Sequence, residues 1–398
     1  MENYLSQRLQ NMEESQTIAM NEKTKDLQEQ GLDIVNLTAG EPDFFTPDAI
    51  KAAAKAAVDN NFSFYTPVAG YMDLRKAIAG KLQRENNLTY TPEQIVVTNG
   101  AKHALANAIT SLIDPNDEAI IPAPYWVSYS ELVKLAGGSN VIVPTSIDSN
   151  FKMTTAQLEA AITPRTKLLI LCSPSNPSGA VYSKAELQAL AEVVAKHKRL
   201  FVLSDEIYEH INFVGKHESM AQFESIKDRV IIINGVSKAY AMTGYRIGYS
   251  ATSLGLAKAC TKLQGQFTSN ASSIAQKASV AALTLDNTPT QEMTKAFLRR
   301  RNLVMEWLQQ MPGLRCTVPD GAFYAFPDVS AFFGKSDGTT TLKNDMDVCL
   351  YLLEKALVAS VPGSAFGAPS CIRLSYATSD ENLLKAMKSM KAALAKLV

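Results

Sequence analysis

A lysine and an arginine lie eight positions apart in the stretch 237–249, SKAYAMTGYRIGY, which follows the apolar run VIIIN after two residues. A lysine beside the end of a buried strand can lose its charge through desolvation and form a Schiff base with a carbonyl compound. An arginine nearby can hold a phosphate through two parallel hydrogen bonds. Taken alone, Lys238 could equally be a solvated surface lysine, and Arg246 could belong to an ordinary turn.

Polar and aromatic side chains also follow the ends of three further apolar runs. QIVVT is followed by NGAK, which opens a helix whose free amides suit a phosphate and which carries Lys102. EAIIP is followed by Trp126, which could stack on a flat ring, and KLLILC by SPSNPSG, a turn that can present the amide of Asn176. Each has an ordinary alternative, namely a helix start, a core tryptophan or a Pro-rich turn.

The run LFVLS is followed by DEIYEH, which places Asp205 at a strand end and Tyr208 three residues later. A carboxylate at this point can pair with a protonated ring nitrogen, although Asp after a strand also commonly caps a helix. Tyr208 can donate a hydrogen bond to a ligand or simply pack in the core. Ligands of open α/β sheets collect beyond the carboxyl ends of the strands. Five such signals at five strand ends therefore predict one site.

The elements that position these residues are predicted from short β-branched runs, which alternate with Ala-rich helical patterns along the chain. The expected strands are 94–98, 118–122, 140–144, 167–172, 200–204 and 230–234, with helices at 101–113 and 184–198. The alternation predicts a mostly parallel sheet with helices on both faces. We place this α/β domain at 47–288, and expect Thr46 to cap a helix that begins at Pro47.

The remaining segments form a different pattern. After Asp286 come a long charged helix through 295–311, strands at 321–326 and 371–377, and a helix that starts near Ser379. This is typical of a smaller α+β domain, which we place at 289–398. The N-terminal segment 1–46 is expected to have no strand of its own.

Composition excludes several classes of protein. The chain has 398 residues, and Lys plus Arg and Asp plus Glu both total 39, so no excess charge points to nucleic acid or an anionic membrane. No run approaches the ~20 apolar residues of a membrane span, and we expect a cytosolic protein. Five scattered cysteines form no CxxC or Cys/His cluster, so we expect reduced thiols and no structural metal.

Seven motifs together resemble the class I and II aminotransferases, the aspartate aminotransferase fold type (fold type I) of pyridoxal-phosphate enzymes. They are AGEPDF, YTPVAG, PYWVSY, SPSNPSG, SDEIYEH, SKAYAMTGYRIGY and RLSYA, and their order matches over nearly the whole chain. The resemblance implies that the N-terminal segment packs with the C-terminal domain. It also implies a homodimer, in which Tyr65 reaches the cofactor phosphate of the neighbouring subunit.

The resemblance also implies roles for the residues of each motif. Lys238 would bond covalently to pyridoxal phosphate, Asp205 would hold its ring nitrogen, Tyr208 its phenolic oxygen, and Arg246 its phosphate. Further cofactor contacts would come from Gly100, Ala101, Lys102, Trp126, Asn176 and Ser237. The substrate would be bound by Gly40, Asn176 and Arg373 at its α-carboxylate, with Lys102 and Trp126 beside it.

The implied reaction is transamination of L-aspartate with 2-oxoglutarate, giving oxaloacetate and L-glutamate. It requires a second cation for the distal carboxylate, and Lys102 either supplies it or supports only the phosphate. Two departures from the family pattern, Ala101 in place of glycine and Tyr245 in place of tryptophan, leave the pocket shape open. Prephenate, aromatic or neutral amino acids, and β-elimination remain alternatives. A DNA-binding fusion or an inactive scaffold is disfavoured, because no basic segment is present and Lys238, Asp205 and Arg373 are intact.

Overall fold

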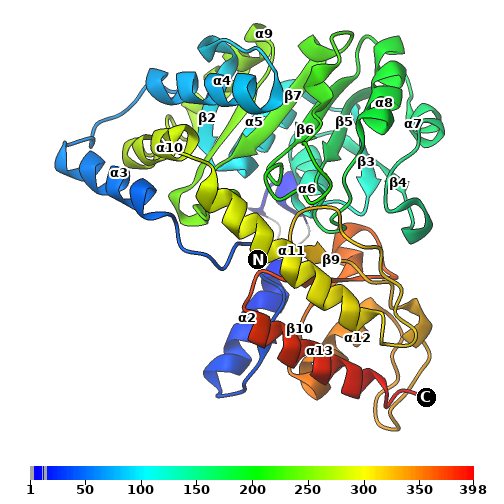
Figure 1. Cartoon of the computed structure of the whole chain (residues 1–398). Coiled ribbons are helices and arrows are strands. Elements are labelled where there is room, and N and C mark those ends of the chain that lie inside the picture. The colour runs from blue at the N-terminus through cyan, green and yellow to red at the C-terminus, as the bar shows by residue number, and fades with distance from the viewer. Residues whose placement is uncertain (1–3, 11, 13–15) are drawn as a thin grey trace.

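The computed structural model describes residues 4–10, 12 and 16–398, and these form two bodies (Figure 1). The larger body is built on a seven-stranded sheet, and the smaller one lies below it in the view of Figure 1. Helix α11 (Thr288–Leu308) runs from the larger body down into the smaller one. The predicted domain boundaries at residues 47 and 288 stay a prediction.

The sheet has the order β2-β8-β7-β6-β5-β3-β4. Its strands are β2 (Ile95–Asn99), β3 (Glu118–Ala123), β4 (Ser139–Pro144), β5 (Thr166–Cys172), β6 (Phe201–Asp205), β7 (Val230–Gly235) and β8 (Ile247–Ala251). The six predicted strands are confirmed. The sequence did not predict β8, which runs antiparallel to both of its neighbours, β2 and β7. The other neighbouring pairs are parallel.

Both faces of this sheet are covered by helices. Alternate residues of β7 show this directly, because Ile232 joins one hydrophobic core while Ile231 and Ile233 join the other. Buried parallel strands of this kind are apolar on both sides. One core is covered by α3 (Asp48–Asp59), α4 (Met72–Asn86), α7 (Thr155–Ala161), α8 (Lys184–Lys196) and α10 (Ser273–Thr284). The other is covered by α5 (Ala101–Leu112), α6 (Ser128–Leu135) and α9 (Leu254–Phe267).

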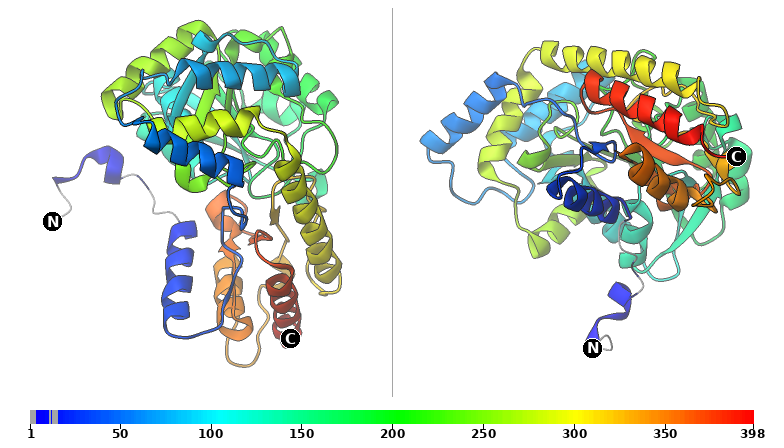
Figure 2. Two further views of the ribbon diagram at one scale, coloured as in Figure 1. Left: turned by 60° about the vertical axis from the view of Figure 1, so that its left-hand side comes forward. Right: turned by 90° about the horizontal axis from the view of Figure 1, so that it is seen from below.

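The smaller body has its own core and two small sheets. Besides part of α11 it contains α2 (Gln16–Glu29), α12 (Asp345–Ala356) and α13 (Asp380–Leu394), seen together in both views of Figure 2. β1 (Val35–Asn36) pairs in parallel with β10 (Val358–Ala359), and β11 (Val361–Pro362), β12 (Ile372–Ser375) and β9 (Tyr324–Ala325) form an antiparallel sheet. A short helix α1 (Gln7–Gln10) precedes these elements.

Short 3₁₀ helices connect many of these elements. They are Pro92–Gln94, Ile147–Ser149, Met220–Gln222, Lys227–Arg229, Thr243–Tyr245, Ser330–Phe332 and Gly363–Phe366. Among the described helices, none is both long and apolar enough to cross a membrane.

Two sequence predictions about the N-terminal region are wrong. The segment before residue 47 does contain a strand, β1, whose two residues are too few to show a period and whose partner β10 lies more than 300 residues away. Thr46 does not cap α3, because its hydroxyl donates instead to the carbonyl of Ala241, 2.6 Å away, and no side chain caps this helix. The predicted start of a helix near Ser379 is confirmed: α13 begins at Asp380, and Ser379 caps it by accepting the N–H of Asn382 at its Oγ.

Candidate active site

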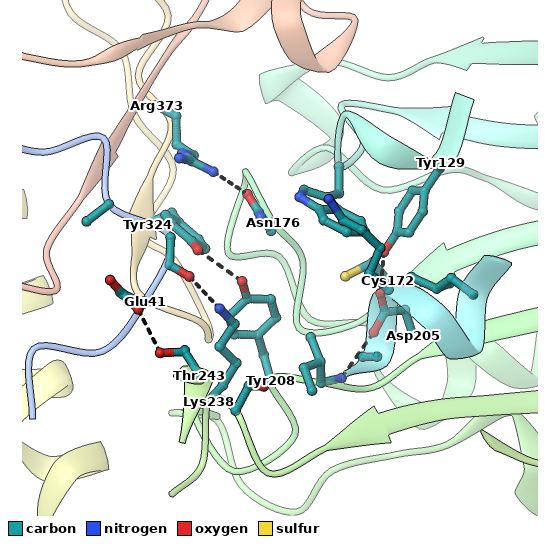
Figure 3. Close-up of a pocket in the computed structure, with 18 of the residues that line it drawn as sticks. Glu41, Tyr129, Cys172, Asn176, Asp205, Tyr208, Lys238, Thr243, Tyr324 and Arg373 are labelled. Carbon is teal, nitrogen blue, oxygen red and sulfur yellow. Dashed lines mark hydrogen bonds between the residues drawn. The ribbon is translucent and has the colours of Figure 1, made fainter. Parts of the chain in front are cut away.

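A cavity of about 510 Å³ lies at the carboxyl edge of the sheet, where residues from the strand ends meet the smaller body (Figure 3). This volume is typical of a small-molecule site. The predicted site residues that line it are Gly40, Ala101, Lys102, Trp126, Asn176, Asp205, Tyr208, Ser237, Lys238, Arg246 and Arg373. Gly100 is not among the lining residues and directly precedes one of them, Ala101, as the N-cap residue of α5. Tyr65 lies outside the cavity of its own chain and is 91% exposed.

Lys238 lies in the loop that follows β7, and its side chain points into the cavity (Figure 3). Its Nζ donates a hydrogen bond to the carbonyl of Gly40 in the N-terminal segment. Burial lowers the pKa of Lys238 to about 8, because an ammonium group loses hydration there, and the nearby charge of Arg373 acts in the same direction. An appreciable fraction of this amine is therefore uncharged and nucleophilic near neutral pH.

Asp205 ends β6 and is buried beside the cavity. Its Oδ2 accepts a hydrogen bond from the hydroxyl of Tyr129 at 2.6 Å, and its Oδ1 accepts the backbone N–H of Ile207 at 3.3 Å. Burial raises the pKa of Asp205 to about 6 despite these two donors. A cation placed in the cavity against this carboxylate would favour its charged form.

The start of α5 and Arg246 together form a cradle for an anion. Gly100 adopts a φ of +80°, and a side chain there would collide with the guanidinium group of Arg246. A side chain at Gly248 on β8 would likewise collide with the backbone of Gly100 and Ala101. These close approaches bring the free amides at the N-terminus of α5 beside a guanidinium group, a combination that suits a phosphate.

Arg373 projects from β12 and is 2% exposed. Its guanidinium group donates to the amide oxygen of Asn176 at 3.0 Å and to the carbonyl of Thr38 at 2.7 Å, and it lies over the ring of Tyr324. Its Nε has no hydrogen-bond partner. Burial lowers its pKa, and no acidic side chain in the described part of the chain pairs with it. A buried cation of this kind is suited to bind a carboxylate.

Lys102, in the first turn of α5, is a further cation at the cavity. Its Nζ lies 4.9 Å from the centre of the Trp126 ring. Desolvation lowers the pKa of Lys102, and the charge of Arg246 lowers it further. Among the described residues, none forms an ion pair with it. Besides Arg246 of the anion cradle and the amine of Lys238, the cavity therefore has two further cations, Lys102 and Arg373, that form no ion pair within the described residues.

Several lining residues were not predicted from the sequence. Tyr324 exchanges a hydrogen bond of 2.9 Å with Tyr208, and Thr243 donates to Glu41 at 2.7 Å, which joins the loop after β7 to the N-terminal segment (Figure 3). Tyr129 lies within PYWVSY, where only Trp126 was predicted to have a role, and Tyr324 lies within the predicted strand GAFYAF. Tyr324 lies inside the predicted strand 321–326, so its position gave no signal of the kind that marked the strand-end residues.

The donors of the cavity fit one kind of ligand. An anion cradle, a buried carboxylate, a nucleophilic amine and a neighbouring indole suit a flat, phosphate-bearing ring with a basic nitrogen and a reactive carbonyl group. Lys102 and Arg373 suit a second ligand that has two carboxylates, one for each cation. The fit rests on the chemistry of the donors and on the close contacts at Gly100 and Gly248.

The chain is similar to known proteins over almost its whole length. The family model described as "Aminotransferase class I and II" matches residues 32–390. An aspartate/prephenate aminotransferase of Cereibacter sphaeroides is 47% identical over 98% of both chains. A solved aspartate aminotransferase of Rhizobium meliloti is 44% identical, with a TM-score of 0.96 over 99% of both chains. An aspartate aminotransferase of Thermus thermophilus, solved with maleate, is 42% identical, with a TM-score of 0.91 over 98% of this chain and 99% of that one.

Proposed function

The chain belongs to the class I and II aminotransferases, and on that premise we propose that it is an aspartate aminotransferase. The reaction is the exchange of the amino group of L-aspartate with 2-oxoglutarate, giving oxaloacetate and L-glutamate. One observation carries this choice of substrate, namely that Arg373 and Lys102 both face the cavity of Lys238 without an anionic partner among the described residues. A dicarboxylate supplies one anion for each cation.

The cofactor in this proposal is pyridoxal 5'-phosphate. When bound, it supplies an electron-withdrawing ring that makes the α-hydrogen of the amino acid acidic. Arg246, Ser237 and the amides of Gly100, Ala101 and Lys102 would hold its phosphate. Trp126 would stack on its ring, and Asn176 would contact its phenolic oxygen. The fold that the relatives share is fold type I of such enzymes.

Lys238 performs the chemistry. Its Nζ, with a pKa of about 8, is deprotonated often enough to act as a nucleophile and as a base. Lys238 would hold the cofactor covalently and, when released by the substrate, would move the proton that leaves the substrate α-carbon. The same amine both accepts and donates, so a residue that cannot titrate at this position cannot replace it.

Asp205 and Tyr208 tune the cofactor. The buried Asp205 carboxylate, which accepts a hydrogen bond from Tyr129, would stabilise a positive charge on the ring nitrogen. Tyr208, which shares a hydrogen bond with Tyr324, would donate to the phenolic oxygen. Asp205 is the last residue of β6 and Tyr208 follows three residues later, so a single piece of backbone would set both contacts.

Substrate binding uses two ends of the cavity. Arg373 with Asn176 and the backbone of Gly40 holds the α-carboxylate, which would satisfy the unpaired Nε of Arg373. Lys102 attracts the distal carboxylate. Tight binding at both ends fixes the α-hydrogen relative to Lys238, and such orientation contributes several kcal/mol to catalysis, up to roughly 7–11 kcal/mol in favourable cases.

The active form is proposed to be a homodimer. Tyr65 and Phe64 are 91% and 79% exposed, and their segment is held on α9 and α10, where the side chains of Gln264 and Gln276 donate to Val68 O and Thr66 Oγ1 at 2.8 and 3.1 Å. An exposed aromatic pair on an anchored segment suits a contact with a second subunit. Sedimentation of a fully active monomer would contradict this. The cytosolic location stays a prediction.

A second candidate substrate is prephenate, because the Cereibacter relative is described as an aspartate/prephenate aminotransferase. Prephenate also carries two carboxylates, so the same two cations serve it. The proposed function is tested by a panel of amino donors with 2-oxoglutarate, followed by prephenate as the acceptor with aspartate as the donor. We expect aspartate to be the best donor with 2-oxoglutarate. Preference for a neutral or aromatic donor would contradict the proposal, and release of ammonia would indicate a lyase.

A further inference from the structure

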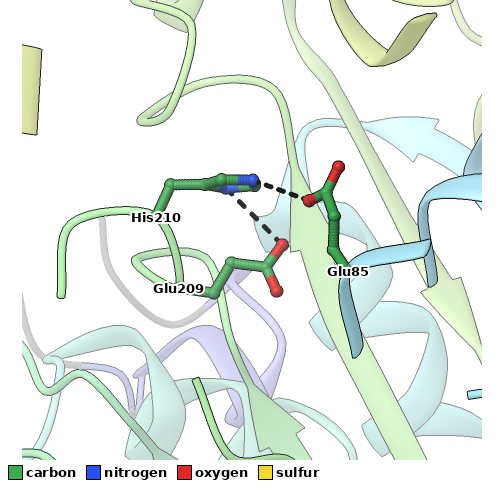
Figure 4. A group of neighbouring side chains, drawn as sticks. All are labelled: Glu85, Glu209 and His210. Carbon is green, nitrogen blue, oxygen red and sulfur yellow. Dashed lines mark hydrogen bonds and ion pairs between the residues drawn. The ribbon is translucent and has the colours of Figure 1, made fainter. Parts of the chain in front are cut away.

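A second cluster of charged side chains lies outside the cavity, next to the segment that carries Asp205 and Tyr208. Figure 4 shows part of it, where Glu209 and His210 of this segment meet Glu85 of α4. None of these three residues lines the cavity. The reaction proposed above makes no use of them.

Glu209 has partners for both of its carboxylate oxygens. Its Oε1 accepts from Lys81 Nζ and, at 2.9 Å, from the side-chain amide of Asn234, while its Oε2 accepts from the amide of Asn86 at 2.9 Å. Lys81 also donates to the oxygen of Asn86 at 2.8 Å. Lys81 is 1% exposed, so this closed network is shielded from water. It joins α4, the segment after β6, and β7.

The residue after Asp205 is anchored in a similar way. Glu206 Oε1 accepts the hydroxyls of Ser204 at 2.9 Å and Ser219 at 2.6 Å, and its Oε2 lies 3.1 Å from His217 Nε2. Each of the two residues that face the cavity is thus followed by a buried glutamate that is bound elsewhere. Consecutive Cα atoms are 3.8 Å apart, so fixing each glutamate restricts the residue before it.

The same atoms could be considered as metal ligands, because oxygens of Glu206 and Glu209 and a nitrogen of His217 lie within 4.8 Å of one another. Lys81, however, already holds Glu209, and a divalent cation there would face a buried ammonium group at close range. The arrangement therefore suits a structural network better than a cation site.

We propose that Lys81 is a positioning residue of the active site: by holding Glu209 it fixes Tyr208 and, through the same segment, Asp205. The inference rests on the proposed transamination. Directional charged hydrogen bonds restrict this segment more than apolar packing would, because they define both a distance and an orientation. A misplacement of about 1 Å at an active site can lower the rate by roughly a hundredfold.

The test compares Lys81→Met and the double variant Lys81→Met/Glu209→Gln with wild type. The double variant removes both charges of the Lys81–Glu209 pair together, so neither partner is left as an unpaired buried ion. The matched control is Lys167→Met, which breaks a half-buried ion pair of 3.0 Å with Asp117 at the opposite, amino-terminal edge of the sheet. Three quantities are measured: kcat and KM for aspartate, the pH midpoint of the bound cofactor's absorbance, and amide exchange of residues 205–211 without cofactor.

We expect both Lys81 variants to lower kcat by roughly 10- to 100-fold with KM changed less than about threefold, because Lys81 touches no substrate. The absorbance midpoint should shift, since Asp205 and Tyr208 set it, and exchange of residues 205–211 should accelerate. The control should change none of these.

A double variant that folds and keeps the wild-type kcat, absorbance midpoint and exchange rates would overturn the inference and leave Lys81 a purely structural residue. If wild type does not transaminate aspartate, the proposed function fails. The exchange measurement still decides whether Lys81 restrains the segment, so the two failures are distinguishable.

Discussion

Two groups of buried ionisable side chains meet at the segment 205–211. The pKa shifts favour the neutral form in one group and the charged form in the other. On the cavity side, burial raises the pKa of Asp205 and lowers that of Lys238, so both shifts favour the neutral form. On the far side, burial also opposes ionisation of Glu209, but the charges of Lys81 and two histidines outweigh it and hold the pKa well below its usual range. Both groups are buried. They differ in whether each charge has enough partners of opposite charge within the protein.

The difference indicates which group is functional. A buried charge whose partners within the chain are insufficient destabilises the fold and gains when a ligand supplies the missing charge. A buried charge whose hydrogen-bond and ion-pair partners are all present holds the backbone in one position. A ligand could bind such a charge only by breaking those contacts. The segment therefore carries reactive groups on one side and an anchor on the other. The following predictions test this contrast.

The largest effect is expected for Lys238→Ala. Loss of the amine that is proposed to transfer the proton should lower aspartate turnover by roughly 10⁴-fold or more, measured in single-turnover assays. The cofactor-free protein should not become less stable. The folded-state pKa of Lys238 lies below its unfolded value, so its charge opposes folding fully below pH 8, and this penalty disappears as pH rises from about 8 to 10.5. Borohydride reduction that labels another lysine would show the assignment to be wrong.

Removing the charge on the anchored side should have the opposite effect on stability. Glu209→Gln leaves Lys81 buried with an incomplete partner, and we expect the free energy of unfolding at pH 7 to fall by about 3–5 kcal/mol in urea titrations. Glu209 has a depressed folded-state pKa, so its contribution exists above the unfolded pKa and is lost as pH falls below about 4.5. Glu224→Gln, which breaks an exposed pair with Lys227, is the control and should cost less than about 1 kcal/mol.

A substitution of Lys102 tests whether a cation without an ion-pair partner at the cavity binds the substrate. Lys102→Ala should lose roughly 2–5 kcal/mol of transition-state stabilisation for aspartate, as kcat/KM reports, because one partner of a desolvated charge pair is removed. Turnover of alanine should change far less, since alanine places no charge there. An equal loss for both substrates, together with weaker cofactor binding, would identify Lys102 as a phosphate ligand instead.

The smallest expected effect is the pH dependence that Asp205 contributes. Its folded-state pKa of about 6 lies above the ordinary 3.8, so the folded state retains the proton longer and stability falls as pH rises from about 4 to 6. The difference of about two units corresponds to about 3 kcal/mol. Comparing unfolding of cofactor-free wild type and Asp205→Asn at pH 4.5 and 7 isolates this contribution. An unchanged difference between the two pH values would contradict the raised pKa.

Part of the cavity side could be predicted from the sequence because several of its residues come shortly after an apolar run. Parallel strands place their carboxyl ends at one edge, so Lys102, Asn176, Asp205 and Lys238 converge once the strands are recognised. Tyr65 stays a prediction, because a residue that acts in a second subunit lies outside the cavity of its own chain. Strand β8 was missed because its first three residues, 247–249, belong to a motif that was interpreted only for its lysine and arginine.

The anchored side could not be predicted from the sequence. Lys81 and Glu209 are 128 positions apart, and a lysine on an amphipathic helix looks like a solvated residue until the fold buries it. The motif DEIYEH contains both glutamates, yet no spacing rule indicates that they turn away from Asp205 and Tyr208. The same limit explains why the predictions for β1 and Thr46 were wrong, because their partners, β10 and Ala241, are also remote in sequence.

The contrast between the two sides is tested most directly by one pair of near-isosteric substitutions, Asp205→Asn and Glu209→Gln, in the cofactor-free protein at pH 7. Urea unfolding should show the first variant to be more stable than wild type, by up to about 3 kcal/mol, and the second to be less stable. Changes of the same sign would contradict the account, because they would mean that the two carboxylates of this segment do not differ in how their charges are compensated.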